Sequence, residues 1–574
     1  MNCIKQLVLI AITLIIASCS GNKKEKDNRP VSSKAGGKLV FAEIAKPLSL
    51  FPQKLTRIEE AFICNQIYEP LIRLNAKTLD LIPALAEKWE VSADGKHIKF
   101  YLRKGVRFQD NPCFNNGKGR EITTADVLYT FEKLCYETSD NYHFYTICND
   151  RIVGAKEYNE AMKNYKEGQE KPAIKGIKII DDYTFSIDLM YPNYDSFLQL
   201  LATPIAAIIP KEGYEKYGSQ LDFGAGPYVI EKSLSNENQL VLLKNPYYYG
   251  VDKDGFALPY IDTIIIKYFE NTEDAITAFL NHQVDVVNDI PNSAAKRVVE
   301  NHINSFQKVP PEYIIDVSTQ MFVQYILINT HMYPFDNVKV RRAVNYAIDR
   351  NKIIEKAFNG QAMPGIYGIT PPAFKKYDIT KIQGYDIDVA KAKKLLSEAG
   401  YPDGKGFPTV TIYTNKGFSK TQVAINEMQR QLKENLNINV VFESLPLDIK
   451  FNLELKNKGH FFRQGWVADF PSPENFLNIF YGKYITLDTS KTYFPNTQRY
   501  INPIFDELFE KGRDAVNKDT AYQYFMKAEQ ILMDDAPLIV LWYEASYRLY
   551  NNRVKDLFMN PMRYYDLRIA HVEK

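Results

Sequence analysis

One acidic residue, Asp469, stands in an apolar stretch of the sequence. In "GWVADFPSPENFL", residues 465–477, it follows Trp-Val-Ala and precedes Phe. No Lys or Arg occurs between Arg463 and Lys483. A buried carboxylate is costly unless another group pairs with it. The partner of Asp469 is therefore either a side chain distant in sequence or a group that does not belong to the protein.

The residue patterns of common enzymes are absent from the chain. GxSxG, HExxH, GxxxxGK[ST] and GxGxxG do not occur, and no two of the seven histidines lie at positions i and i+4. Residues 305–308 match SxxK and residues 139–141 match SDN, but their order is reversed relative to penicillin-binding enzymes and KTG is missing. These patterns argue against an acyl-enzyme mechanism. A hydrolase with dispersed carboxylates stays an open alternative, because the 69 acidic residues give no spacing signal.

The cysteines permit disulfides but do not predict a metal site. Six are present, and four of them, Cys64, Cys113, Cys135 and Cys148, follow residue 20. Four cysteines allow three pairings, and free buried thiols are the alternative. No CxxC occurs and only His143 lies between Cys113 and Cys148, so neither zinc nor another cofactor is predicted.

The amino terminus predicts export. An apolar run from Leu7 to Ala17 follows Lys5 and has the length of a signal-peptide core. It leads into Ile-Ala-Ser-Cys19, which resembles the lipobox of bacterial lipoproteins. We expect a signal peptide over 1–19, lipidation of Cys19, and a polar tether over 20–37. The net charge of +2 gives no indication of nucleic-acid binding.

Periodicity predicts a multidomain protein that mixes helices and strands. Hairpins are expected around Asp94-Gly95 and Asp181-Asp182, and a helix is expected between them in which Thr123 or Thr124 is the cap. Further helices are expected over 336–357 and from Asp388 to Gly400. A strand–helix–strand pattern over 408–444 then predicts a parallel α/β unit.

Five segments resemble one family, the extracytoplasmic solute-binding proteins of peptide-type ABC importers (family 5). They are a signature region "PALAEKWEVSADGKHIKFYLRKGVRFQD" with "GREITTADVLYTFEKL", the segment "GAGPYVIEKS" ending in "NPYYYG", the central "NTHMYPFDNVKVRRAVNYAIDRNKII", the helix and exit "AKKLLSEAGYPDG", and "GWVADFPSPENFL". They occur in family order between residues 83 and 477.

The resemblance implies a bilobed α/β fold of the periplasmic-binding-protein type (type II, cluster C). Two hinge strands would join the lobes, and an extra domain would be inserted in the first lobe. The expected boundaries are lobe I at 38–71 plus 191–320 plus 541–574, the inserted domain at 72–190, and lobe II at 321–540.

The resemblance also implies a function. In peptide-binding members, the acid of the last segment pairs with the ligand's α-amino group, which gives Asp469 a ligand-binding role, with Trp466 as a wall of the pocket. We expect a monomeric, lipid-anchored receptor on the extracytoplasmic side of a membrane, which delivers peptides to the permease of an ABC importer. The alternatives are an envelope peptidase on the same scaffold, or the same receptor binding an oligosaccharide or a metal chelate.

Overall fold

A computed structural model describes residues 29–360, 362–416, 419–456, 458–485 and 495–573. The predicted signal peptide, Cys19 and the first part of the tether lie outside the described residues. Among the described helices, none is both long enough and apolar enough to cross a membrane.

A large mixed sheet runs through the molecule. In the described part of the chain it contains eleven strands, ten of them in the order β15-β14-β16-β12-β17-β11-β1-β10-β9-β8, with β13 also paired to β17. Their bounds are β1 (Lys38–Glu43), β8 (Tyr228–Ile230), β9 (Gln239–Lys244), β10 (Thr263–Tyr268), β11 (Val286–Val287), β12 (Tyr313–Ile328), β13 (Met363–Pro364), β14 (Val410–Asn415), β15 (Val440–Leu445), β16 (Phe461–Val467) and β17 (Leu538–Asn551).

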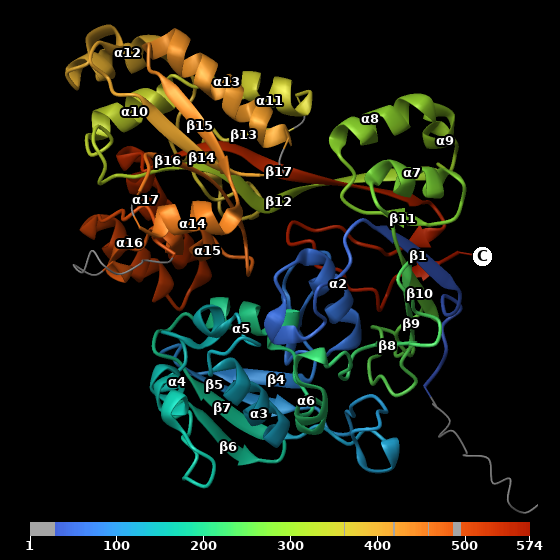
Figure 1. Ribbon diagram of the computed structural model, residues 1–574. Coiled ribbons are helices and arrows are strands. Elements are labelled where there is room, and N and C mark those ends of the chain that lie inside the picture. Colours follow the sequence, from blue (N-terminus) through green and yellow to red (C-terminus); the bar gives the residue numbers. More distant parts are fainter. Residues whose placement is uncertain (1–28, 361, 417–418, 457, 486–494, 574) are drawn as a thin grey trace, which may run out of the picture.

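Two long antiparallel strands, β12 and β17, carry this sheet from one half of the molecule to the other (Figure 1). The first part of β12 pairs with the end of β17, next to β11, whereas its last part lies between β16 and β17. The register between the two strands shifts between Thr319 and Val323. An irregularity of this kind bends and twists a strand pair locally. We call the half around β1 and β8–β11 the first lobe and the half around β14–β16 the second lobe.

Helices cover both lobes. Those of the first lobe are α2 (Ile58–Ile67), α5 (Tyr194–Leu201), α6 (Lys211–Tyr217), α7 (Thr272–Leu280), α8 (Asn292–Asn301) and α9 (Ile303–Gln307). Those of the second lobe are α10 (Val338–Tyr346), α11 (Arg350–Phe358), α12 (Val389–Glu398), α13 (Ser419–Leu436), α14 (Leu447–Leu455), α15 (Glu474–Leu477), α16 (Pro503–Arg513) and α17 (Lys518–Asp535). Two apolar clusters, one containing Phe480 and Tyr543 and the other Val340 and Trp542, form the core of the second lobe.

A separate sheet forms the four-stranded unit, drawn in blue and cyan in Figure 1. Its order is β4-β5-β7-β6, and α3 and α4 accompany it. The bounds are β4 (Ala86–Val91), β5 (His97–Leu102), β6 (Ile177–Asp181), β7 (Thr184–Asp188), α3 (Thr124–Leu134) and α4 (Ala155–Asn164). Both predicted hairpins are confirmed, because β4 pairs with β5 and β6 pairs with β7, each antiparallel. The helix predicted after Thr123 is confirmed as α3, and Thr123 forms a capping box with Asp126.

Two further sequence predictions have different outcomes. The α/β unit over 408–444 is confirmed, since β14 and β15 pair in parallel and α13 connects them. The single helix over 336–357 is wrong: α10 ends at Tyr346 and α11 begins at Arg350. The break occurs because the Asp349 side chain accepts a hydrogen bond from the Lys352 backbone N–H and caps a new helix.

The four described cysteines, Cys64, Cys113, Cys135 and Cys148, all carry free thiols. Three are buried, and the Cys135 and Cys148 side chains are hydrogen-bonded neighbours. The sequence allows either disulfides or free thiols at these positions, and the structure has free thiols.

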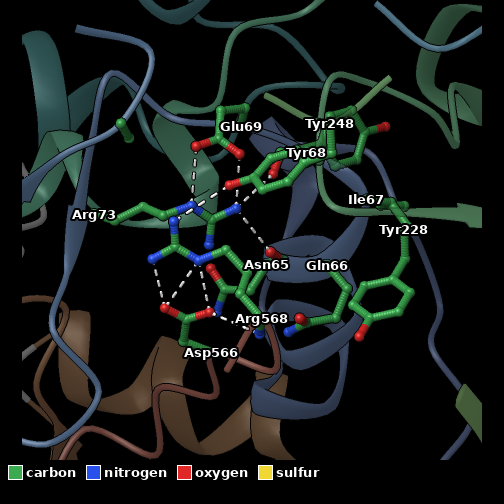
Figure 2. Close-up of polar contacts among 12 residues, drawn as sticks. Asn65, Gln66, Ile67, Tyr68, Glu69, Arg73, Tyr228, Tyr248, Asp566 and Arg568 are labelled. Carbon is green, nitrogen blue, oxygen red and sulfur yellow. Dashed lines mark hydrogen bonds and ion pairs between the residues drawn. The ribbon is translucent and has the colours of Figure 1, made fainter. Parts of the chain in front are cut away.

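A buried cluster of charges fixes the carboxy-terminal segment to the first lobe (Figure 2). Arg73 and Glu69 form a fully buried pair with N–O distances of 3.0 and 3.1 Å. Arg568 pairs with Asp566 at 2.6 Å and donates a hydrogen bond to the Tyr248 hydroxyl at 3.2 Å. The chain therefore returns to the first lobe after β17 and is held there by hydrogen-bonded ions.

Candidate ligand-binding site between the lobes

Asp469 lies in the turn that follows β16, where one side chain links it to Trp466. Asn475 of α15 accepts a hydrogen bond from Trp466 Nε1 at 2.7 Å and from the Asp469 backbone N–H at 3.3 Å. The Asn475 amide in turn donates to Asp469 Oδ2 at 3.3 Å. The two predicted site residues thus belong to one small hydrogen-bond network. The sequence analysis did not predict this network, because Asn475 carries no signal that separates it from other asparagines.

The Asp469 carboxylate is only partly compensated by the protein. Burial raises its pKa, while the hydrogen bond from Asn475 and the charges of His143 and Arg151 act in the opposite direction. Within the described chain, no Lys or Arg forms an ion pair with it inside 4.0 Å. A carboxylate can accept about four hydrogen bonds, so Asp469 retains capacity for a further donor.

The segment around Asp469 contacts the first lobe and the four-stranded unit directly. The Ser196 hydroxyl of α5 donates a hydrogen bond to Glu474, and Arg151 pairs with the same carboxylate at 3.4 Å. The Arg151 guanidinium also lies 5.5 Å from the centre of the Phe470 ring. These contacts join residues that are far apart in the sequence and hold the two sides of the junction together.

A second group of contacts closes the same junction at its edge. Arg513 of α16 lies 3.7 Å from the centre of the Tyr191 ring, and Lys518 pairs with Asp195 at 3.4 Å. The Tyr194 hydroxyl donates to the carbonyl of Val516 at 3.2 Å. The lobes are therefore in contact along this face.

A small cavity of about 20 Å³ remains beside the crossing strands. Gln320 and Phe322 of β12 line it from one side, Ala468 from a second and Arg563 from a third. A cavity of this size holds about one water molecule. The cavity ends one residue before Asp469.

The ends of two parallel strands contribute an acidic group that the sequence analysis missed. Glu43 ends β1, and Asn288, which follows β11, donates a hydrogen bond to its carboxylate at 2.9 Å. Burial raises the pKa of Glu43 to about 7. The neighbouring Asp289 pairs with Arg563 and accepts a hydrogen bond from Ser546 at 2.5 Å. The carboxyl ends of parallel strands are a common place for ligand sites, but neither strand had been predicted.

The fold and this junction together define a class of protein. Two α/β lobes are joined by two crossing strands and meet at an acid that has capacity for another hydrogen-bond donor. This is the architecture of a bilobed binding protein, in which closure around a ligand is a hinge motion.

Comparison with known proteins gives the family. The model of the bacterial extracellular solute-binding proteins, family 5 (middle region), matches residues 80–487, so the chain belongs to this family. It is therefore a member of a family of solute-binding receptors, and the expected family and bilobed α/β fold are confirmed.

Individual relatives cover almost the whole chain. Heme-binding protein A of Haemophilus influenzae is 27% identical over 97% of this chain and 97% of its own. The periplasmic oligopeptide-binding protein OppA of Salmonella typhimurium is 28% identical over 87% of this chain and 86% of its own. Among solved structures, the periplasmic binding protein DppA of Helicobacter pylori in complex with the peptide STSA matches with a TM-score of 0.70 and 26% identity, covering 94% of this chain and 99% of that one.

Proposed function

We propose that this protein is a receptor that captures peptides between its two lobes and delivers them to the permease of an ABC importer. Several relatives are named as oligopeptide- or dipeptide-binding proteins, and one related structure contains a bound peptide. In this proposal the protein has no catalytic group and releases its ligand unchanged.

The main support for the proposal is the environment of the Asp469 carboxylate. Its carboxylate lies at the lobe junction, is held by a single side-chain donor, and has a pKa raised by burial. A ligand α-ammonium brings three donors and a positive charge, which is what such a carboxylate lacks. Trp466, held by Asn475 in the same network, would form a wall of the pocket.

The similarity to heme-binding protein A makes heme a second candidate. Heme presents two propionate groups, which are anions. An ionised Asp469 would repel them, whereas it would attract the amino end of a peptide. The charge at the junction therefore favours a peptide over heme, and the same argument applies to an acidic metal chelate.

Native mass spectrometry of the protein purified from cells tests the proposed ligand. We expect peptides bound at one per chain, and added peptides should be recovered intact. Recovery of heme, an oligosaccharide or a chelate in place of peptide would refute the proposed ligand. Turnover of added peptides would favour the alternative of a peptidase on the same scaffold.

The proposal includes a lipid anchor and a division into domains. Residues 1–18 would be removed, which leaves Cys19 as the first residue, and its lipid would hold a monomer on the extracytoplasmic side of the membrane through the tether over 20–37. The boundaries remain those of the sequence analysis, with lobe II at 321–540. Two features support these limits. The register between β12 and β17 shifts between Thr319 and Val323, next to the limit at 321. Strand β13 pairs with Trp542 and Tyr543 of β17, next to the limit at 540.

A further inference from the structure

A cavity of about 560 Å³ opens between α3 and α6, among residues that take no part in the junction around Asp469. Its volume falls in the range of small-molecule sites, about 300–1,000 Å³. Both helices lie side by side beneath α2 in Figure 1. Its lining combines two aromatic rings with five charged side chains, so it is more polar than a typical small-molecule site.

Two tyrosines form the walls. The rings of Tyr129 and Tyr214 meet edge to face with centroids 6.4 Å apart, and Phe51 stacks on Tyr214 at 5.3 Å. The Tyr129 hydroxyl oxygen is buried and has no hydrogen-bond partner in the described part of the protein. Burial also raises the pKa of Tyr129, so the hydroxyl stays protonated. Because this oxygen is buried from solvent, it offers no accessible donor to a ligand in the cavity, and Tyr129 contributes its ring.

One ammonium in the cavity lacks a negative partner. Lys133 Nζ lies 4.8 Å from the centre of the Tyr214 ring and 5.2 Å from that of Tyr129. Burial lowers the pKa of Lys133 and the charge of Lys171 lowers it further, whereas the nearby carboxylates of Glu132 and Glu215 act in the opposite direction. Among the described residues, Lys133 makes no ion pair within 4.0 Å.

The other charges of the cavity are already paired. Lys171 pairs with Glu132, and Lys211 pairs with Glu215 at 3.7 Å. Of the five charged residues that line the cavity, three are positive and two negative, which leaves one positive charge, that of Lys133. The two glutamates would repel a dianion such as phosphate, so the charge balance selects a single negative charge.

We propose that this cavity is a second binding site, separate from the lobe junction, for a small organic carboxylate with an aromatic body. The carboxylate would accept a hydrogen bond from Lys133 Nζ. The aromatic body would pack against the rings of Tyr129 and Tyr214, where aromatic pairs favour edge-to-face or offset contacts.

Titration of the full chain with indole-3-acetate and phenylacetate, followed by ligand-observed NMR and calorimetry, tests the site. We expect saturable binding with a dissociation constant below about 10 mM, and about tenfold weaker binding of the uncharged 2-phenylethanol. Lys133→Met keeps the length of the side chain and removes its charge, and should weaken carboxylate binding about tenfold or more. Tyr129→Phe should leave carboxylate binding unchanged and the empty protein equally or more stable, since it keeps the ring and removes a buried, unpaired hydroxyl.

Lys163→Met is the matched control, because this exposed lysine of α4 pairs with Glu160 outside the cavity. Its affinity for the carboxylates should equal that of the native chain. The proposal is wrong if neither carboxylate binds saturably, if Lys133→Met binds as tightly as the native protein, or if 2-phenylethanol binds equally well.

Discussion

Ser196 and Glu474, 278 residues apart in the chain, are joined by a hydrogen bond that crosses the lobe junction. Both side chains are buried, and Arg151 adds a charged contact to the same carboxylate at 3.4 Å. The position of Glu474, five residues after Asp469, places this contact beside the proposed ligand site. Closure of the lobes and binding of the ligand therefore share one short segment of the second lobe.

Glu474→Ala should shift the protein toward an open form. The substitution removes the acceptor of Ser196 and leaves the Arg151 guanidinium without its carboxylate, each in a buried position. We expect a larger radius of gyration for the ligand-free protein by small-angle scattering and about tenfold weaker peptide binding, equivalent to about 1.4 kcal/mol. Asp195→Asn is the control, because its pair with Lys518 is exposed and contributes little. An unchanged radius for Glu474→Ala would show that the contact does not hold the lobes.

Asp469→Asn should weaken peptide binding by roughly two orders of magnitude, since losing one member of a buried charge pair costs about 2–5 kcal/mol. The free energy of unfolding of the empty protein should stay constant or rise, because burial already disfavours the ionised acid. Calorimetry and denaturant unfolding measure the two effects.

The same contact can be removed from the ligand side. N-acetylation of the peptide should weaken binding to the native chain as much as Asp469→Asn does, and the two losses should not add. Additive losses, or tight binding of acetylated peptide to the native protein, would assign the ligand's amino end to another residue.

Glu43 should make the stability of the protein depend on pH. Its pKa is about 7 in the folded protein and 4.5 as the reference value, so between these pH values the folded state binds more protons than the unfolded state. Stability is therefore lost as pH rises from 4.5 to 7. We expect a loss of roughly 2 kcal/mol, allowing for the partial exposure of the side chain. Glu43→Gln should remove this dependence in denaturant unfolding at pH 5 and pH 8, and an equal pH slope in both proteins would contradict the assignment.

Arg73→Met should cost about 3–5 kcal/mol of stability, because it leaves the Glu69 carboxylate buried without its charge partner. Replacing both members, as Arg73→Met with Glu69→Leu, should recover part of the loss. Lys88→Met is a suitable comparison, because its pair with Glu90 is exposed and its loss should change the unfolding midpoint little. Equal midpoints for Arg73→Met and Lys88→Met would mean that the buried pair contributes no more than a surface pair.

Cys19→Ala should release a folded protein from the membrane, because a polar tether buries no surface of the folded part. Fractionation with detergent, together with the mass of the mature amino terminus, checks this outcome. Retention of the variant in the membrane fraction would argue against the anchor.

Local sequence signals predicted much of the secondary structure. Asp94-Gly95 predicted a hairpin because the turn needs a positive φ, and Gly95 has a φ of +70°. Asp388 predicted the start of α12, where its side chain accepts a hydrogen bond from the Lys391 backbone. The break at Asp349 was missed, because the apolar periodicity of residues 336–357 runs through a residue that caps a second helix.

The candidate site was predicted only in part, because most of it depends on pairings between distant segments. Asp469 stood out as an acid in an apolar stretch. Asn475, Ser196 and Arg151 carry no comparable signal, since polar residues of these types occur throughout the chain. Their roles follow from the closure of the lobes, which local patterns do not encode.

The course of the sheet has a consequence for the order in which the protein can complete its fold. Strand β11 and the first part of β12 both pair with the last residues of β17, and Val286 pairs with Tyr550. Because synthesis proceeds from the amino end, this part of the first lobe has an unfilled edge until β17, which begins at Leu538, has been made. Completion of the first lobe is therefore delayed to the end of synthesis, and any product cut short before Leu538 is left with open strand edges that invite degradation or aggregation.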